Sequence, residues 1–410
     1  MTNPSKFEDH SRRLLAFIER GSGLDETEFS ASATELFALQ FAHVAPYRRL
    51  CEARRVTPDS LPGWRQIPAM PTTAFKELEL TSLAPAERTA VFHSSGTTGH
   101  LPSRHFHNAR SLAVYEASLL SWFERHIAPA ALVGRDSVEP HMERSAASIS
   151  GAVTLSQESR FVRTSSVGSW GSKESRPAIL CLAPPPEQAP HSSLVHMFAA
   201  VSREFGSQAS RFLATVAPDN SWSLDFAAAL AALRHAEQAA QPPVLLGTAF
   251  MFVHLLDALA QDGLSITLPP GSRVMETGGY KGRSREVPKA ELHALLTSRL
   301  SIPRTHLVCE YGMSELSSQA YDRVAGSPTI LSPLSSLFSF PPWARAVVIS
   351  PETGREVAEG ETGLLRIFDL ANVRSVMAIQ TEDLAVRRGE GFELLGRASH
   401  SESRGCSLLA

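Results

Sequence analysis

Hydroxyl side chains and glycines are concentrated in one short stretch of this chain, made up of Ser94, Ser95, Gly96, Thr97, Thr98 and Gly99. The stretch follows residues 89–92, whose Thr-Ala-Val-Phe sequence is typical of a strand. Glycine lets the backbone turn tightly, and successive backbone N–H groups can then form a concavity that binds phosphate. The hydroxyl groups supply further donors to phosphate oxygens. On its own, the stretch is equally compatible with a surface turn rich in serine and glycine.

Two commoner phosphate-binding motifs do not fit this stretch. A Walker A loop would continue with Gly-Lys-Ser/Thr, but His100 follows Gly99. A dinucleotide-binding fingerprint needs a third glycine and a following βαβ pattern, and both are missing here.

Two later motifs each follow a strand-like run. Residues 273–277 lead into Gly278 and Gly279, and residues 307–310 lead into the sequence Tyr311, Gly312, Met313, Ser314 and Glu315. Ligands of parallel sheets bind beyond the carboxyl ends of the strands, so both motifs are candidates for a binding site. Paired glycines would let a flat ring lie against the backbone. In the second motif, the tyrosine could stack on adenine, the serine could bind phosphate and the glutamate could hold Mg²⁺. A plain turn is the alternative for each motif.

A last pair of polar residues follows in the C-terminal part of the chain. Asp383, in the sequence Thr-Glu-Asp, follows the strand-like residues 376–379, and Arg397 ends the β-rich region. A carboxylate can accept both hydrogen bonds of a ribose diol. An acid in a loop is also often simply solvated.

The order of these motifs resembles the core motifs of the adenylate-forming superfamily, which includes acyl-CoA synthetases, peptide-synthetase adenylation domains and luciferases. The resemblance implies that residues 94–99 hold the β- and γ-phosphates of ATP while a carboxylate attacks the α-phosphate. It also implies Mg²⁺ at Glu315, and nucleotide contacts from the Gly-Gly, Tyr-Gly-x-Ser and Asp383 motifs and from Arg397.

Three departures from the common pattern stand out. Ser314 replaces the usual threonine, and Glu382 replaces the usual glycine before Asp383. The sequence also ends at Ala410, where typical members continue with a small mobile C-terminal domain, so we expect that domain to be absent.

One branch of the superfamily fits the expected absence of that domain. Residues 67–76, 103–105, 192–195 and 404–408 resemble the LuxE-type acyl-protein synthetases, the fatty-acid-activating subunits of the bacterial bioluminescence reductase. In that family a cysteine near the C-terminus takes the acyl group from the acyl-adenylate and passes it to a partner reductase. Cys406 stands at the matching place, and the nearby Arg404 would favour its thiolate. An idle tail thiol is the alternative.

Composition sets wider limits. The chain has 410 residues, a formal net charge of −3 and 43% hydrophobic residues, which suit a globular protein and do not favour a nucleic-acid-binding face. The four cysteines are scattered and form no metal-spaced pair. Without an apolar leader or an apolar run of membrane-spanning length, we expect a cytoplasmic protein with no membrane span.

Strand-like and helix-like segments alternate along most of the chain, which predicts an α/β fold with largely parallel sheets. Among them, we expect a buried strand at residues 244–247 and an alanine-rich helix over residues 223–240. Cys181 and Cys309 lie in apolar strand-like runs, so we expect both thiols to be buried.

We expect an adenylation core over residues 1–343, with an insertion or mobile loop at about 134–176. A small β-rich subdomain over residues 344–397 would complete the nucleotide site, and residues 398–410 would form a short tail.

These expectations lead to an ATP-dependent ligase that activates a carboxylic acid, with a fatty acid favoured by the resemblance. The acyl group would pass to a cysteine of the protein itself and then to a partner reductase or another acceptor. One alternative is an aryl or small-acid adenylase that transfers to CoA, a carrier protein or an amine. Another is a non-catalytic nucleotide-binding remnant.

Overall fold

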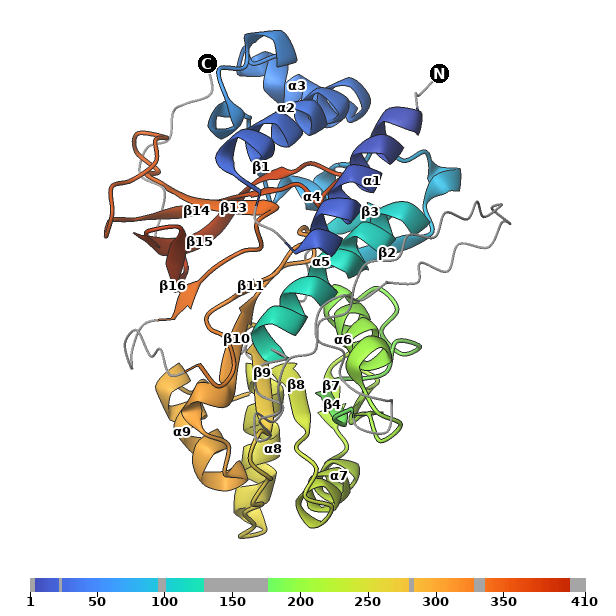
Figure 1. Ribbon diagram of the computed structural model, residues 1–410, viewed down its shortest axis with the longest axis vertical. Helices are drawn as coiled ribbons and strands as arrows, with labels where there is room; N and C mark the ends of the chain where they lie inside the picture. Colours follow the sequence, from blue (N-terminus) through green and yellow to red (C-terminus); the bar gives the residue numbers. More distant parts are fainter. Residues whose placement is uncertain are drawn as a thin grey trace, which may run out of the picture.

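The computed structural model describes residues 4–21, 24–94, 101–128, 176–279, 284–327 and 336–398 (Figure 1). Three of the sequence predictions fall outside these ranges: the phosphate-loop residues 95–99, the insertion apart from Arg176, and the tail with Cys406. Among the described residues, no helix is long and apolar enough to cross a membrane.

A mostly parallel sheet forms the centre of the molecule, with the strand order β11-β10-β9-β8-β4-β5. Only β11 runs antiparallel to its neighbour. The strands are β4 (Ile179–Leu182), β5 (Arg211–Phe212), β8 (Val244–Thr248), β9 (Arg273–Thr277), β10 (Leu307–Tyr311) and β11 (Ala320–Tyr321). Every residue of β4, β8, β9 and β10 is buried, as expected for a parallel sheet that is covered on both faces.

Helices cover both faces of this sheet. Ile179 and Cys181 point to one face and pack with α5 and α6, whereas Leu180 and Leu182 pack on the other face with α7 and α8. The helices are α5 (Ala109–Ile127), α6 (Ser193–Phe205), α7 (Phe226–Gln238), α8 (Ala249–Gln261) and α9 (Lys289–Leu300). These positions confirm the predicted α/β fold. One boundary is wrong, because the sequence predicts a helix from residue 223. Residues 222–224 instead form β7 (Trp222–Leu224), which pairs with β6 (Ala214–Val216).

A second sheet is antiparallel, with the order β12-β16-β15-β14-β13. Its strands are β12 (Leu337–Phe338), β13 (Ala344–Ile349), β14 (Thr362–Asp369), β15 (Ala378–Arg388) and β16 (Gly391–Arg397). The short strand β1 (Met70–Pro71) joins it from the N-terminal part of the chain, pairing in parallel with Ile379 and Gln380 of β15.

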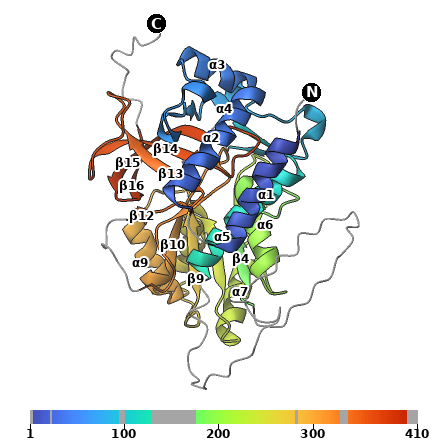
Figure 2. The ribbon, with the colours of Figure 1, turned by 45° about the horizontal axis from the view of Figure 1, so that its top comes forward.

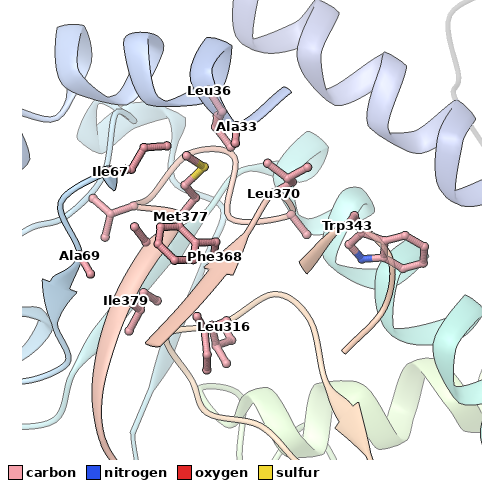
Figure 3. Close-up of a cluster of buried hydrophobic side chains, with 14 of the residues drawn as sticks. Ala33, Leu36, Ile67, Ala69, Leu316, Trp343, Phe368, Leu370, Met377 and Ile379 are labelled. Carbon is pink, nitrogen blue, oxygen red and sulfur yellow. The ribbon is translucent and has the colours of Figure 1, made fainter. Parts of the chain in front are cut away.

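The N-terminal helices α1 (Pro4–Arg20), α2 (Glu26–His43) and α3 (Ala45–Ala53) lie on the same side of the molecule as this second sheet (Figure 2). They share one hydrophobic core with it. Figure 3 shows part of that core, with Leu36 of α2 and Ile67 gathered around Met377 and Phe368. The first and last parts of the described chain therefore form one packed unit.

The remaining elements are short. A hairpin of β2 and β3 brackets the predicted phosphate loop, and α4 directly follows β1. The bounds are α4 (Ala74–Glu77), β2 (Ala90–His93), β3 (Arg104–His107), β6 (Ala214–Val216) and β7 (Trp222–Leu224), with 3-10 turns at Pro58–Ser60, Trp64–Gln66, Pro85–Glu87 and Arg304–His306.

Candidate functional site

A cavity of about 450 Å³ lies where the carboxyl ends of the parallel strands face the second sheet. Thr248, Thr277 and Glu310, at the ends of β8, β9 and β10, form one wall. Thr381 and Asp383 of β15 line the cavity from the second sheet. The cavity thus occupies the edge of the sheet where ligands of α/β proteins bind.

Most of the described residues among the predicted site residues line this cavity. They are Ser94, Gly278, Gly279, Gly312, Ser314, Glu315, Asp383 and Arg397. Gly278 has φ +68°, a left-handed conformation that favours glycine at the turn after β9. Tyr311 is the exception, because it does not line the cavity.

Tyr311 instead holds Asp383 in place. Its hydroxyl group donates a hydrogen bond to Asp383 Oδ2 at 2.7 Å, and its ring packs edge-on against Phe338, Phe340 and Phe392. Burial, together with the neighbouring carboxylate, raises the pKa of Tyr311 well above its usual value, so the hydroxyl remains a donor. Adenine stacking on this ring stays a prediction.

Arg397 contacts the other oxygen of Asp383. The two residues face each other across β15 and β16, and Arg397 Nε lies 3.6 Å from Asp383 Oδ1. The Asp383 side chain is only 14% exposed, whereas that of Arg397 is 76% exposed. The largely buried carboxylate therefore accepts a hydrogen bond from Tyr311 on one oxygen and has a solvent-exposed cation beside the other.

Ser314 and Glu315 form a buried turn that is tied to the hairpin. Ser314 Oγ donates to Glu315 Oε2 at 3.1 Å and lies 3.2 Å from Ser103 Oγ. His105 Nδ1 lies 2.9 Å from the Ser314 carbonyl oxygen, and since that oxygen only accepts, Nδ1 carries the proton. Burial lowers the pKa of His105 to about 4, which keeps the ring neutral near pH 7. The Glu315 carboxylate is a hard oxygen donor of the type that suits Mg²⁺.

The β2–β3 hairpin brings both ends of the predicted phosphate loop to the cavity. Ser94 N donates to the Ser103 carbonyl oxygen at 3.3 Å, and Ser103 N donates to Ser94 Oγ at 2.9 Å. Ser94 and Leu101, on either side of residues 95–100, both line the cavity. The two described residues that flank the predicted loop therefore lie at the same cavity.

Lys76 is a cavity residue to which the sequence assigned no role. Pairing of β1 with β15 places α4 beside the cavity, which Thr72, Thr73 and Lys76 line. Within the described ranges, the Lys76 ammonium group has no hydrogen bond or ion pair. In the sequence, Lys76 belongs to the Pro-Thr-Thr-Ala-Phe-Lys segment of residues 71–76, which resembles LuxE-type synthetases but did not indicate a place in the site.

A family model described as "Acyl-protein synthetase, LuxE" matches residues 153–410, more than half of the chain. The chain belongs to the LuxE acyl-protein synthetase family. A curated relative, the long-chain-fatty-acid–luciferin-component ligase of Aliivibrio fischeri, is 24% identical over 177 residues, which are 40% of this chain and 44% of the relative. The alignment thus spans less than half of that relative's length.

Solved structures of adenylate-forming enzymes share the fold. A 2-hydroxyisobutyryl-CoA ligase in its postadenylation state, in complex with 2-HIB-AMP, superposes with a TM-score of 0.54 and 12% identity, covering 92% of this chain and 70% of that one. An open conformation of the same ligase, in complex with 2-HIB-AMP and CoA, gives a TM-score of 0.54 and 13% identity, covering 92% and 77%. At these identities the likeness shows the fold alone, and it confirms the adenylate-forming core predicted from the motifs.

In this LuxE-family chain, Glu310 is a further cavity residue that the motifs did not indicate. It is buried and accepts a hydrogen bond from the Thr277 hydroxyl group. Burial raises the pKa of Glu310 to about 7. A side chain at the adjacent Gly312 would collide with Glu310 Oε1, which explains the glycine at that position.

The raised pKa of Glu310 makes the stability of the protein depend on pH. The folded state binds the Glu310 proton more tightly than the unfolded state, so this contribution is fully present below about pH 4.5 and is lost as the pH rises through about 7. Between about pH 4.5 and pH 7, the free energy of unfolding of Glu310→Gln should therefore fall by up to about 3 kcal/mol less than that of the wild-type protein. Urea unfolding at a series of pH values measures the difference. Glu352→Gln, which removes a surface carboxylate, is the control. If the free energy of unfolding of Glu310→Gln depends on pH as in the wild-type protein, the raised pKa of Glu310 would be contradicted.

The cysteines Cys51, Cys181 and Cys309 are all buried, and none lines the cavity. Burial raises the pKa of Cys51 to about 11 and raises those of Cys181 and Cys309 still further. Cys309 also donates to Glu276 Oε1 at 2.8 Å. The predicted burial of Cys181 and Cys309 is thus confirmed, and these three thiols are poor nucleophiles.

Proposed function

We propose that this chain activates a carboxylic acid with ATP to form an acyl-adenylate and then transfers the acyl group to its own Cys406. The observation that carries the proposal is the convergence of Ser94, Glu315 and Asp383 on one cavity. These residues belong to the three motifs to which the resemblance assigns phosphate, Mg²⁺ and ribose contacts. Family membership supports the same chemistry.

Two parts of the cavity wall suit two parts of the nucleotide. Asp383, oriented by Tyr311 and Arg397, would accept hydrogen bonds from the ribose diol. Lys76 and the hairpin residues around Ser94 would contact the phosphates, where an ammonium group with no partner among the described residues can offset negative charge. Bound Mg²⁺, held by Glu315, would neutralise charge on the leaving pyrophosphate.

The proposed reaction has two steps. An oxygen of the substrate carboxylate attacks the α-phosphorus of ATP, and pyrophosphate leaves with the electron pair of the broken P–O bond. The Cys406 thiolate then attacks the acyl carbonyl carbon, the bond to AMP breaks, and a thioester forms. Lys76 and the backbone donors of the hairpin would stabilise the charge that develops on the phosphates in the first step.

The proposal also covers the identity of the acid and the identity of the final acyl acceptor. The name of the Aliivibrio fischeri relative and the family resemblance favour a fatty acid and a partner reductase. Copurification of an aldehyde-forming reductase with this chain would support that acceptor. Transfer to CoA, a carrier protein or an amine remains the alternative.

Pyrophosphate–ATP exchange tests the first step directly. With Mg²⁺ and a panel of carboxylic acids, the full chain should incorporate labelled pyrophosphate into ATP only when a suitable acid is present. Absence of exchange with every acid, although ATP binds, would favour the non-catalytic nucleotide-binding remnant.

Asp383→Ala should raise the ATP concentration needed for half-maximal exchange by about 100-fold, because two hydrogen bonds to a charged acceptor are together worth about 3 kcal/mol. Tyr311→Phe keeps the carboxylate but removes its 2.7 Å hydrogen bond, and it should have a smaller effect of about fivefold. Titration of ATP in the exchange assay measures both. If Asp383→Ala binds ATP like the wild type, the Thr-Glu-Asp motif does not hold the ribose.

A further inference from the structure

A second cluster of polar side chains lies inside the molecule, apart from the cavity. It consists of Glu276 of β9, His293 of α9 and Cys309 of β10, whose ligand-type atoms all lie within 4.8 Å of one another. All three residues are buried, and none lines the cavity. In the part of the chain that the structure describes, no other group of three such side chains comes this close. Carboxylate, imidazole and thiol are the groups that bind zinc in proteins.

The topology brings these three residues together from three elements. Cys309 lies directly opposite Glu276 in the parallel pairing of β9 with β10, so the two side chains point to the same face of the sheet. Val274, two residues before Glu276, points to that face too and packs in one core with Leu296 of α9. His293 precedes Leu296 by one helical turn, and α9 lies beside β9 and β10 (Figure 1). Because the ligands come from separate elements, the spacing of the cysteines in the sequence did not indicate this site.

The distances within the cluster fit a tetrahedral metal ion. His293 Nε2 lies 3.3 Å from Glu276 Oε1 and 3.7 Å from Cys309 Sγ. Zinc binds nitrogen and oxygen at about 2.1 Å and sulfur at about 2.3 Å, so a tetrahedral ion separates nitrogen from oxygen by about 3.4 Å and from sulfur by about 3.6 Å. Cys309 Sγ and Glu276 Oε1 are closer, at 2.8 Å, and would move apart by about 0.8 Å on binding. A small rotation of either side chain achieves this.

A divalent cation also balances the charges of this cluster. The Glu276 carboxylate and a Cys309 thiolate together carry two negative charges, which zinc neutralises while His293 binds as a neutral ring. Lys289 lies near Cys309 as well, but its charge is offset by the buried Asp322, whose Oδ2 lies 3.4 Å from Lys289 Nζ. A coordinating thiol loses its proton to the solvent when the metal binds, so burial does not prevent Cys309 from acting as a ligand.

A cluster held by hydrogen bonds alone is the alternative. The Cys309 thiol and the His293 Nε2–H group would then both donate to the same oxygen of Glu276. A thiol is a weak donor, and a buried carboxylate is costly unless its partners offset the lost hydration. Zinc coordination satisfies the carboxylate, the imidazole and the thiol at once.

We propose that Glu276, His293 and Cys309 bind one zinc ion, which fastens α9 to β9 and β10. Three protein ligands leave the fourth position to water. Nitrogen and sulfur ligands select zinc over Mg²⁺ and Ca²⁺, which bind oxygen, so this site is distinct from the Mg²⁺ proposed at Glu315. Glu276 lies two residues before Gly278. The ion therefore supports the strand ends that carry the cavity wall and takes no part in the reaction.

Metal analysis of the purified full chain tests this proposal. The chain is incubated with Zn²⁺, dialysed into metal-free buffer and analysed for metal, and it should retain about one zinc ion per chain. Cys309→Ala and His293→Leu should each lose the ion, because two remaining ligands hold zinc too weakly to survive dialysis. Cys181→Ala, which removes an equally buried thiol from β4, should retain it. A wild-type chain without zinc, or equal zinc in the wild type and Cys309→Ala, would overturn the proposal.

Cobalt provides a second readout that does not depend on the folding of a ligand variant. Co²⁺ added to the metal-free wild-type chain should give the absorption bands of a tetrahedral ion and a sulfur-to-cobalt charge-transfer band, which reports a thiolate ligand. Cys406→Ser should keep both, since its thiol is not part of the cluster. Absence of the charge-transfer band in the wild type, or its loss in Cys406→Ser, would overturn the proposal. Neither readout uses ATP or an acid, so the result does not depend on the proposed function.

Discussion

Cys406→Ser should abolish the acyl-protein adduct while pyrophosphate–ATP exchange continues. Adenylation precedes transfer and does not involve the thiol, so only the second step should be lost. After incubation with ATP, Mg²⁺ and a suitable acid, the wild-type protein should carry a mass increment at Cys406. Neutral hydroxylamine should remove it, as expected of a thioester. Mass spectrometry of the intact chain and of its peptides measures both results.

The other cysteines supply the control for this experiment. Cys181 lies in β4, where burial on both faces of the sheet blocks access to its thiol. Cys181→Ala should therefore keep the adduct at Cys406. An adduct mapped to any other residue would contradict the proposal. Acyl transfer that needs CoA and leaves the protein unlabelled would favour the small-acid ligase alternative.

The sequence predicted the parts of the site that follow strands. Runs such as residues 244–247 are apolar at every position, which identified them as strands of a covered parallel sheet. Because the carboxyl ends of parallel strands meet at one edge, Gly278 and Glu315 were expected close together, and both line the cavity. Local pattern and chain topology were sufficient for these residues.

Features that depend on pairing between distant segments were missed. Lys76 reaches the cavity because β1 pairs with β15, and no local pattern in residues 67–76 reveals that partner. Tyr311 is the last buried residue of β10, but only its packing against phenylalanines from β12 and β16 turns its hydroxyl toward Asp383. The start of α7 was misplaced for the same reason, since β7 exists only through its pairing with β6.

Replacing both Gly96 and Thr97 by valine should reduce pyrophosphate–ATP exchange by at least about 100-fold, the usual effect of removing a donor from a preorganised anion site. A β-branched side chain at position 96 restricts the backbone turn, and valine at position 97 removes a hydroxyl donor while keeping the volume. The hairpin that carries this loop should remain folded, because the Ser94–Ser103 hydrogen bonds and the β2–β3 pairing lie outside the substituted residues. Exchange rates and urea unfolding measure activity and fold separately.

Thr97→Ser is the matched control, because it keeps the hydroxyl group and should retain most of the exchange activity. Lys76→Met provides an independent comparison, since it removes the cavity's cation from α4 without altering the loop. If the loop acts on phosphate, both the double valine variant and Lys76→Met should lose exchange while the free energy of unfolding changes little. Unchanged exchange in the double variant would mean that residues 94–99 form an ordinary surface turn. The phosphates would then have to be bound by Lys76 and the Ser314–Glu315 turn, which approach the cavity from α4 and from the residues that follow β10.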